Sequence, residues 1–466
     1  MEVGTKQVEY ERLRQEIVEK NSNLVGLLLS KEELRLNKIL EGYKAEYKAD
    51  CDDNISYKIP VLTDSRIWNS KLYSFLKAMP KGSDLHVHGT ALLPVWKLID
   101  FVLEHDKLYI DVDTCVLYLE KSDDRKMTLK DAFFGGFLTR KQLENIWTVK
   151  GKTHAQNAWE YFENLFSLHG AVDDDTAILF DYYIVAFDYY VESGIFHPEI
   201  HILLSENLEK TVQTLTTIRA AYYKVKEKHP ELIVSIIGCS MKMYFYSLDE
   251  TSKIFQNTLY AKENNKDESD RDDIRDFVIG FDLVNEEDAS RPLKEYAPML
   301  LEFKKEHPDF KYFLHCGESL DAKSDNLIDA YLIGADRVGH GMNLYRYPNL
   351  LKCYADSEIC LECCLVSNQT LGYTKDLRLH PGAEYLKRGV TVALCSDDPI
   401  YQEHETLTDD FFAAVVCWNL GLAEIKQLAL NSIMYSGLTN SSKRKLMSSW
   451  HSAWKEFVKS ELGKEE

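Results

Sequence analysis

The strongest constraint on the fold is a series of short apolar runs, each ending in a side chain that can bind a metal ion. The first run ends in His86-Val87-His88. Two histidines two residues apart on a strand point to the same face, because side chains alternate along a strand. Later runs end in the same way at His315, His340 and Asp397. Parallel barrels carry their chemistry at the carboxyl ends of their strands, so this order predicts such a barrel.

Eight strand-like segments occur along the chain, which is the number that a closed (β/α)8 barrel needs. Helical stretches separate most of them, as the alternation of strand and helix in such a fold requires. We therefore expect an α/β protein of the TIM-barrel class. The expected strands are 85–88, 195–203, 232–238, 277–283, 312–315, 337–339, 359–365 and 390–396.

We expect the barrel to span residues 81–440. The sequence also predicts three additions to it. Residues 1–80 have the pattern of a charged helical arm, and residues 441–466 that of a C-terminal helix. The polar insertion at 106–152 is expected to be a lid, because long loops at barrel mouths commonly are. The arm contains an apolar cluster at 24–29, which either packs on the barrel or joins two copies. The expected assembly is a homodimer.

Charge and composition exclude several classes of partner. The net charge is −20, whereas a non-specific nucleic-acid binder presents a basic surface. No run of about 18 apolar residues occurs, so no membrane span is expected, and the N-terminus lacks the apolar core of a signal peptide. Several of the ten cysteines lie in apolar runs, which is typical of buried thiols. We expect a cytoplasmic protein that acts on a small molecule.

One cysteine pair has the spacing of half a structural zinc site. Cys360 and Cys363 form a C-x-x-C motif, but no second half-site follows. The run around them is apolar, so a buried strand explains the pair better.

The convergence of the strand ends would assemble a catalytic metal site. His86, His88 and His315 would supply three nitrogen ligands, and Asp397 one carboxylate. This set binds one Zn²⁺ per chain and leaves a coordination position for water, which distinguishes a catalytic site from a structural one. The ion lowers the pKa of that water toward neutrality.

Three further side chains would surround this site. Glu318 follows His315 by three residues and can protonate the leaving side of a substrate. His340 can orient the water or take its proton, and Asp398 can hydrogen-bond the substrate. Alone, Asp397-Asp398-Pro399 would be explained as a helix start, but its place after the other motifs favours a site.

These motifs resemble those of the adenosine deaminase superfamily of metal-dependent hydrolases, and most of all its growth factor branch. The resemblance covers roughly residues 60–440 and rests on four markers besides the metal motifs. They are Met79-Pro80-Lys81-Gly82, Gly280-Phe281-Asp282-Leu283-Val284, Ser367-Asn368-Gln369 and Asp376-Leu377-Arg378-Leu379-His380-Pro381.

The resemblance implies hydrolytic deamination of adenosine or 2′-deoxyadenosine to the inosine product and ammonia. It implies the same four zinc ligands, with Glu318 protonating purine N1, His340 handling the hydroxide and Asp398 contacting N7. It also places Trp159 in the substrate pocket and the backbone N–H of residue 285 against purine N3.

The departures from the family pattern all lie on the substrate side. Asn285 replaces a glycine, and Thr90 stands where relatives carry an aspartate that holds the ribose. A pocket histidine expected near 239–242 is absent, with Met241 or a neighbour in its place. The reaction type is therefore better defined than the substrate. The alternatives are a modified nucleoside, a free aminopurine or a nucleotide as substrate, or a non-catalytic signalling relative, which the complete set of site residues disfavours.

Overall fold

The computed structural model describes residues 9–14, 26–50, 65–149, 158–264, 276–402 and 405–464. Eight parallel strands form one sheet in the order β1-β5-β6-β7-β8-β9-β10-β11, and each expected strand segment is present. The strands are almost wholly buried, as expected where helices cover the outside and side chains fill the inside. They are β1 (Gly82–His88), β5 (Ile195–Leu203), β6 (Ser235–Met241), β7 (Val278–Val284), β8 (Lys311–Cys316), β9 (Arg337–His340), β10 (Cys360–Cys363) and β11 (Val392–Leu394).

The sheet closes between its first and last strands through the backbone beside Asp397. A parallel bridge pairs Val87 with Asp397, and the Asp397 N–H donates to the His86 carbonyl at 2.9 Å. The His88 N–H in turn donates to the Asp397 carbonyl at 3.2 Å. The contact that closes the barrel therefore also brings two predicted zinc ligands of β1 next to a third.

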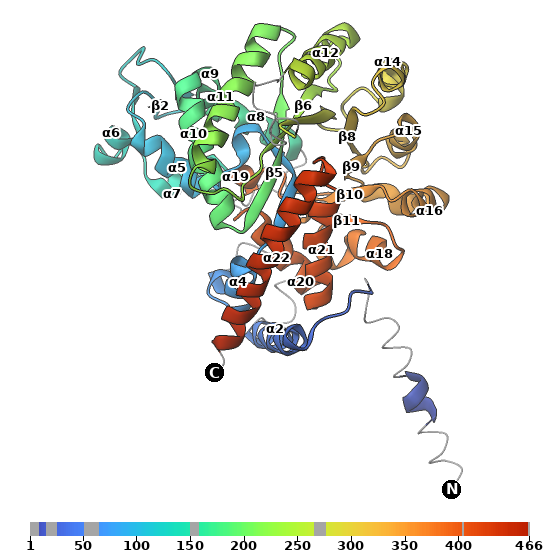
Figure 1. Cartoon of the computed structure of the whole chain (residues 1–466). Coiled ribbons are helices and arrows are strands. Elements are labelled where there is room, and N and C mark those ends of the chain that lie inside the picture. Colours follow the sequence, from blue (N-terminus) through green and yellow to red (C-terminus); the bar gives the residue numbers. More distant parts are fainter. Residues whose placement is uncertain are drawn as a thin grey trace.

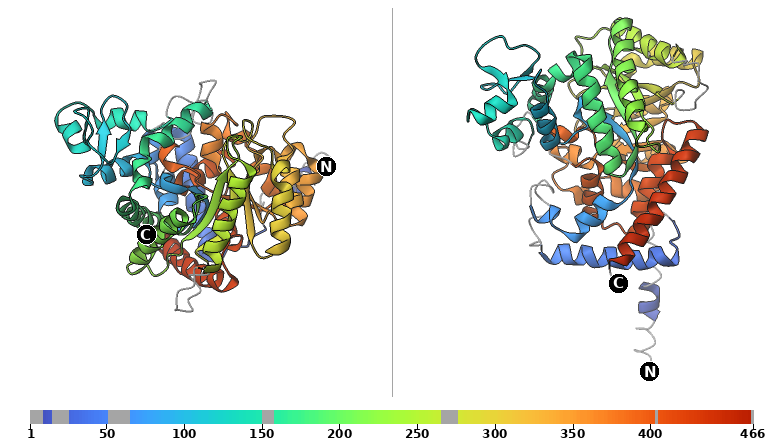
Figure 2. Two further views of the ribbon diagram at one scale, coloured as in Figure 1. Left: turned by 90° about the horizontal axis from the view of Figure 1, so that it is seen from above. Right: turned by 60° about the vertical axis from the view of Figure 1, so that its left-hand side comes forward.

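Helices pack around the outside of this sheet (Figures 1 and 2). Helices follow most of the strands along the chain, as in other (β/α)8 barrels. They are α5 (Val95–Glu104), α8 (Ala158–His169), α9 (Ala171–Asp174), α10 (Thr176–Glu192), α11 (Leu208–Lys226), α12 (Leu248–Asn264), α14 (Leu293–Glu306), α15 (Asn326–Ile333), α16 (Pro348–Asp356), α17 (Leu365–Thr370), α18 (Gly382–Lys387), α19 (Pro399–Gln402), α20 (Leu407–Cys417) and α21 (Leu422–Met434).

The insertion after β1 has secondary structure of its own. A small antiparallel sheet of β2 (Tyr109–Asp111), β3 (Leu117–Tyr118) and β4 (Lys126–Thr128) precedes α6 (Leu129–Phe134) and α7 (Arg140–Ile146). Helices α6 and α7 pack against α5, and the unit projects to one side of the barrel in Figure 1. Its action as a lid stays a prediction.

The N-terminal arm packs on the body of the same chain, with α3 (Ser65–Trp68) and α4 (Lys71–Ala78) leading into β1. Helix α2 (Lys31–Asp50) contacts α4, α21 and α22 (Asn440–Gly463). Its buried Glu33 accepts hydrogen bonds from Trp454 Nε1 at 2.7 Å and Lys426 Nζ at 2.5 Å. Figure 2 shows α2 lying across the foot of the molecule beside α22.

The described part of the apolar cluster at 24–29 lies outside any helix. Gly26 has φ +67°, and the chain from 26 to 30 is not helical. Leu29 packs against the core, whereas Leu28 is 87% exposed. Leu24 and Val25 lie outside the described residues. A left-handed residue cannot lie within an α-helix, and α2 begins only after Ser30.

Candidate active site

Three of the predicted ligands bring their imidazoles together at the carboxyl ends of the strands. The ring centroid of His86 lies 4.3 Å from that of His315 and 5.1 Å from that of His88. Nε2 of His88 lies 3.2 Å from Nε2 of His315. Nε2 of His86 is buried and has no hydrogen-bond partner among the described residues. One ring nitrogen from each residue thus faces a common point, as donors to one ion do.

The fourth predicted ligand faces the same point. Asp397 Oδ1 lies 3.3 Å from His88 Nε2 and 3.8 Å from His86 Nε2. Burial alone would raise the pKa of Asp397, but the hydrogen bond from His88 and the surrounding imidazoles hold it well below its usual value. Its backbone has φ +60°, a left-handed conformation that is uncommon outside glycine and is set by the barrel closure. The side chain is therefore an anion that faces the imidazoles of His86 and His88.

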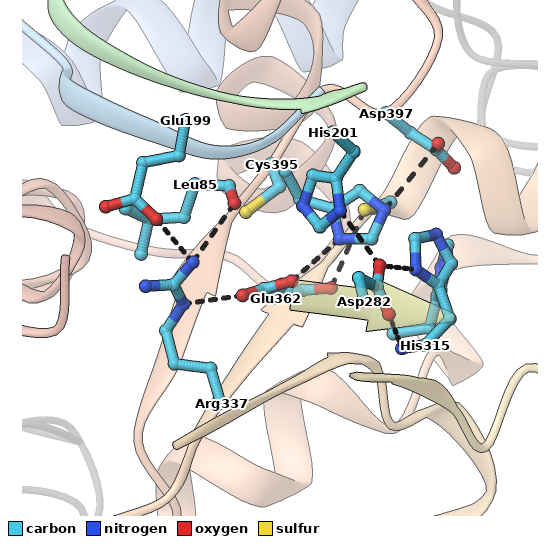
Figure 3. Close-up of polar contacts among 12 residues, drawn as sticks. Leu85, Glu199, His201, Asp282, His315, Arg337, Glu362, Cys395 and Asp397 are labelled. Carbon is cyan, nitrogen blue, oxygen red and sulfur yellow. Dashed lines mark hydrogen bonds and ion pairs between the residues drawn. The ribbon is translucent and has the colours of Figure 1, made fainter. Parts of the chain in front are cut away.

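Carboxylates hold two of these imidazoles from behind, and Figure 3 shows Asp282 beside His315. Glu362 Oε2 lies 2.7 Å from His86 Nδ1, and Asp282 Oδ2 lies 2.5 Å from His315 Nδ1. Each contact places a proton on Nδ1 and leaves Nε2 with a lone pair, which is the usual arrangement behind metal-bound histidine. Burial lowers the pKa of His315 to about 3, so the ring is neutral. The unpartnered nitrogen, the neutral rings and the one carboxylate fit Zn²⁺.

A buried arginine lies behind Glu362. Arg337 Nε donates to Glu362 Oε1 at 2.5 Å, and its Nη2 donates to Glu199 Oε2 at 2.5 Å. The Nη2 group also donates to the Leu85 carbonyl at 3.3 Å. All three charged side chains are fully buried, so each depends on the others for compensation of its charge.

His201 of β5 belongs to this cluster and was not among the predicted site residues. Its Nδ1 lies 2.8 Å from Asp282 Oδ2, and its ring centroid lies 4.5 Å from that of His86. Its Nε2 is buried without a hydrogen-bond partner. The signal in the sequence was a histidine within the apolar run 200–202, at a strand end like those of the predicted ligands.

Two carboxyl groups beside the metal-competent cluster have strongly raised pKa values. Burial, with the charges of Asp397 and Glu287, raises the pKa of Glu318 well above its usual range. Burial and the charge of Asp397 do the same to the pKa of Asp398, whose Oδ1 is buried without a partner. These shifts favour the protonated form of each carboxyl group, which can donate a hydrogen bond.

His340 and Trp159 complete the set of predicted residues. His340 Nδ1 lies 3.4 Å from Glu318 Oε1, and burial lowers the pKa of the ring to about 3. Trp159, on α8, is half-buried and donates from Nε1 to the Tyr373 hydroxyl at 2.7 Å. The charge of Glu318 contributes to the raised pKa of Tyr373, so this pair lies near the acid.

Comparison with known proteins gives the family. Residues 257–452 match the sequence profile described as adenosine deaminase. The chain is 28% identical to an adenosine deaminase of Phlebotomus duboscqi over 423 residues, which covers 84% of this chain and 80% of that protein. It is 27% identical to adenosine deaminase 2 of Homo sapiens over 427 residues, with coverage of 84% and 81%.

The chain belongs to the adenosine deaminase family. It is a metal-dependent aminohydrolase of that family. An amidohydrolase of Burkholderia ambifaria, crystallised with bound zinc, has the same fold with a TM-score of 0.61. That structure is 16% identical, and the match covers 84% of this chain and 95% of that one. The predicted family and fold class are thus confirmed.

The first departure from the family pattern keeps the backbone geometry that a glycine would provide. Asn285, directly after β7, has φ +100°, which only glycine adopts without strain. Its own Oδ1 accepts the N–H of Glu286 at 2.7 Å, a local bond by which asparagine tolerates such a conformation. The backbone at residue 285 therefore keeps a conformation that a glycine would adopt.

The second departure is accompanied by a carboxylate from another part of the chain. Thr90 follows His88 by two residues, and its Oγ1 donates to Oδ2 of Asp173 at 2.9 Å. An acid from α9 therefore lies beside position 90. Solvent reaches the Asp173 side chain, yet the protein around it raises the pKa of the carboxyl to about 6. Asp173 thus places a carboxylate beside Thr90, where the resemblance implies an aspartate.

At the third departure a buried lysine occupies the end of β6. Lys242 follows Met241, and its Nζ donates to the His315 carbonyl at 3.1 Å. Met241 is half-buried and packs against a small cluster that includes Cys239 and Val284. Met241 therefore cannot replace the hydrogen bonds of the histidine that family members place near this position.

Proposed function

We propose that this protein hydrolyses the 6-amino group of adenosine or 2′-deoxyadenosine, forming the corresponding inosine and ammonia. The single observation that carries the proposal is the position of Glu318. A buried carboxyl group, whose pKa burial raises well above its usual range, lies beside three imidazoles and one carboxylate that suit zinc. This pairs an acid for the purine ring with a site for an activated water.

The metal-competent residues define where water attacks. Zn²⁺ held by His86, His88, His315 and Asp397 would lower the pKa of a water in the site toward neutrality. The chain's contribution is to fix this set rigidly, because Glu362 and Asp282 hold two of the imidazoles from behind. A rigid set directs the water at one substrate carbon.

Protonated carboxyl groups recognise the purine. Glu318 donates to ring nitrogen N1, which draws electrons from C6 and makes that carbon accept the oxygen of water. Asp398, also protonated, donates to N7, a nitrogen that can only accept. One water is consumed, the C6–N bond breaks, and the amino group leaves as ammonia.

Acidic side chains near the site favour a nucleoside over a nucleotide. Asp173 offers a carboxylate acceptor for sugar hydroxyls, held by its bond from Thr90. Burial raises the pKa of Tyr373, and the charges of Asp288 and Glu286 add to the shift, so these two acids lie near Tyr373. Their charges, in a chain with a net charge of −20, oppose a substrate phosphate.

A substrate panel tests the proposal. The purified, zinc-loaded full chain is followed by ultraviolet absorbance and ammonia release with adenosine, 2′-deoxyadenosine, N6-methyladenosine, adenine and AMP. We expect turnover of the two adenosines well above that of the other three. Turnover confined to adenine or AMP would overturn the assigned substrate, and no turnover of any compound would overturn the deaminase activity.

We also propose that the arm contributes to a homodimer. Leu28 of the arm is exposed, whereas its neighbour Leu29 packs on the core. An apolar side chain in that position is suited to a second copy of the chain. Light scattering of the full chain at micromolar concentration should give the mass of a dimer, and a monomer mass would contradict the proposal.

A further inference from the structure

A buried chain of hydrogen bonds leads from the backbone of Gly382 to the two catalytic side chains. The Gly382 N–H donates to His380 Nδ1 at 3.1 Å, and His380 Nε2 lies 3.1 Å from Asn368 Oδ1. Asn368 Nδ2 lies 3.2 Å from His340 Nδ1 and 3.3 Å from Glu318 Oε1. Asn368 is fully buried and the other side chains nearly so, so no solvent competes for these bonds.

The direction of every bond in this chain follows from its first member. A backbone N–H can only donate, so Nδ1 of His380 is an acceptor. Burial lowers the pKa of His380 to about 3, and the neutral ring must then carry its proton on Nε2. That proton is donated to Asn368, which assigns Oδ1 to the side of His380 and the amide N–H groups to the catalytic side.

The amide of Asn368 has two N–H groups and two acceptors before it. One faces His340 Nδ1 and the other faces Glu318 Oε1. An accepting Nδ1 places the single proton of the neutral His340 ring on Nε2. A ring in that state can donate from Nε2 but has no lone pair there with which to take a proton.

Packing and backbone hydrogen bonds hold His380 and Asn368 in place. His380 stacks on Trp418 with ring centroids 5.7 Å apart, and Trp418 Nε1 donates to the Leu377 carbonyl at 3.1 Å. A Cβ at Gly382 would lie 2.5 Å from the Trp418 ring, so only glycine allows this approach. Asn368 lies within α17, where its N–H donates to the Cys364 carbonyl at 2.9 Å.

We infer that Asn368, oriented by His380, is a positioning residue that holds His340 as its Nε2–H tautomer and holds Glu318 toward the substrate. His340 then orients the attacking water by donating to it and does not remove its proton. The inference rests on the proposed deaminase function and assigns a role to two sequence markers, 367–369 and 376–381, which meet only in the folded chain.

Asn368→Asp tests the inference, because aspartate keeps the shape but cannot donate toward both catalytic groups. We expect a fall in kcat of about 10- to 100-fold, with KM and zinc content unchanged. Gln369→Glu is the matched control, since it makes the same amide-to-acid change next door, where the amide contacts the Lys375 carbonyl. A kcat for Asn368→Asp equal to that of the control would overturn the inference.

Two variants of His380 separate positioning from packing. Gln places an N–H where Nε2 stood, whereas Phe keeps the stack on Trp418 without a donor. We expect His380→Gln to retain most of kcat and His380→Phe to lose about as much as Asn368→Asp. Equal kcat values for the two variants would show that the donor does not matter.

The tautomer itself is measurable without substrate. In ¹⁵N-histidine-labelled, zinc-loaded protein, the His340 resonance, assigned with His340→Gln, should show Nδ1 unprotonated and Nε2 protonated. Protonated Nδ1 would overturn the inference even if the enzyme deaminates adenosine. Absence of deamination with the expected tautomer would instead contradict the proposed function.

Discussion

Asp397 Oδ1 lies 3.3 Å from Nε2 of His88, and the His88 N–H donates to the Asp397 carbonyl at 3.2 Å. The same two residues therefore provide metal-competent atoms with their side chains and close the barrel with their backbones. An ion bound between the side chains would strengthen the seam between β1 and β11.

Zinc should accordingly stabilise the fold as well as support activity. We expect about one Zn²⁺ per chain, and a gain in unfolding free energy of about 4 kcal/mol when free zinc is 1,000 times its Kd. His86→Ala, His315→Ala and Asp397→Ala should lose both the metal and activity. Elemental analysis and thermal melts with and without chelator measure this. Full activity in chelator, with no metal detected, would contradict it.

Glu318→Gln should preserve zinc and fold while slowing turnover. Glutamine keeps the size of the side chain but has no carboxyl proton to give to N1. Loss of general acid catalysis costs about 10²-fold or more in kcat. Steady-state kinetics with adenosine, alongside metal analysis, measures the effect, and an unimpaired variant would remove Glu318 from the mechanism.

Asp173→Ala should weaken binding of the sugar and not of the base. A hydrogen bond to a charged group contributes about 1.5–3 kcal/mol, so KM for adenosine should rise by about tenfold or more. Asp174→Ala is the control, because it removes the neighbouring exposed acid. The comparison is the ratio of KM for adenosine to the inhibition constant of adenine, and a ratio that does not change would exclude Asp173 from the sugar site.

Glu362→Gln should lower zinc affinity by about 10- to 100-fold, because Glu362 orients His86 and makes it a better ligand. Glu199→Gln provides a control of the same chemistry. Glu199 accepts from Nη2 of the same Arg337 that donates from Nε to Glu362, so it lies one contact further from His86 than Glu362 does. Titration of the metal-free protein with zinc gives the zinc affinity of each variant. Equal losses would mean that the arginine pairing, and not the bond to His86, matters.

Asp409 should make stability depend on pH. Burial raises its folded pKa to about 7 from an ordinary 3.8, and Tyr73 contacts it at 2.6 Å. Because the folded pKa is the higher one, its contribution to stability is complete below pH 3.8 and is lost as pH rises to 7, at about 1.4 kcal/mol per pH unit. Asp409→Asn should flatten that slope in urea unfolding, whereas exposed Asp106→Asn should not. An unchanged slope would contradict the assignment.

The barrel could be predicted from the sequence because each strand leaves a local pattern in it. Each strand is a short apolar run, and the order of the residues at the ends of these runs, not any one of them alone, indicated a site. Boundaries differed where tertiary contacts decide them. The strand expected at 232–238 is β6 (Ser235–Met241), since Leu232 N–H is used in a turn to the His229 carbonyl. The strand expected at 359–365 ends early, because α17 begins at Leu365.

The residues that support the site were harder to find. Glu362 was treated as part of a buried cysteine-containing strand, although a charged residue in such a run was itself a signal. Its partner His86 lies 276 positions away, and nothing in either segment specifies the pairing. Asn368 and His380 were recognised as markers without roles, because their hydrogen-bond directions depend on where Gly382 presents its N–H.

The closure of β1 against Asp397 has a consequence for synthesis of the chain. His86 and His88 leave the ribosome early, whereas the residue that pairs with them follows most of the barrel. The nascent chain therefore cannot form the complete four-residue set, and the first strand has an unpaired edge until residue 397 is available.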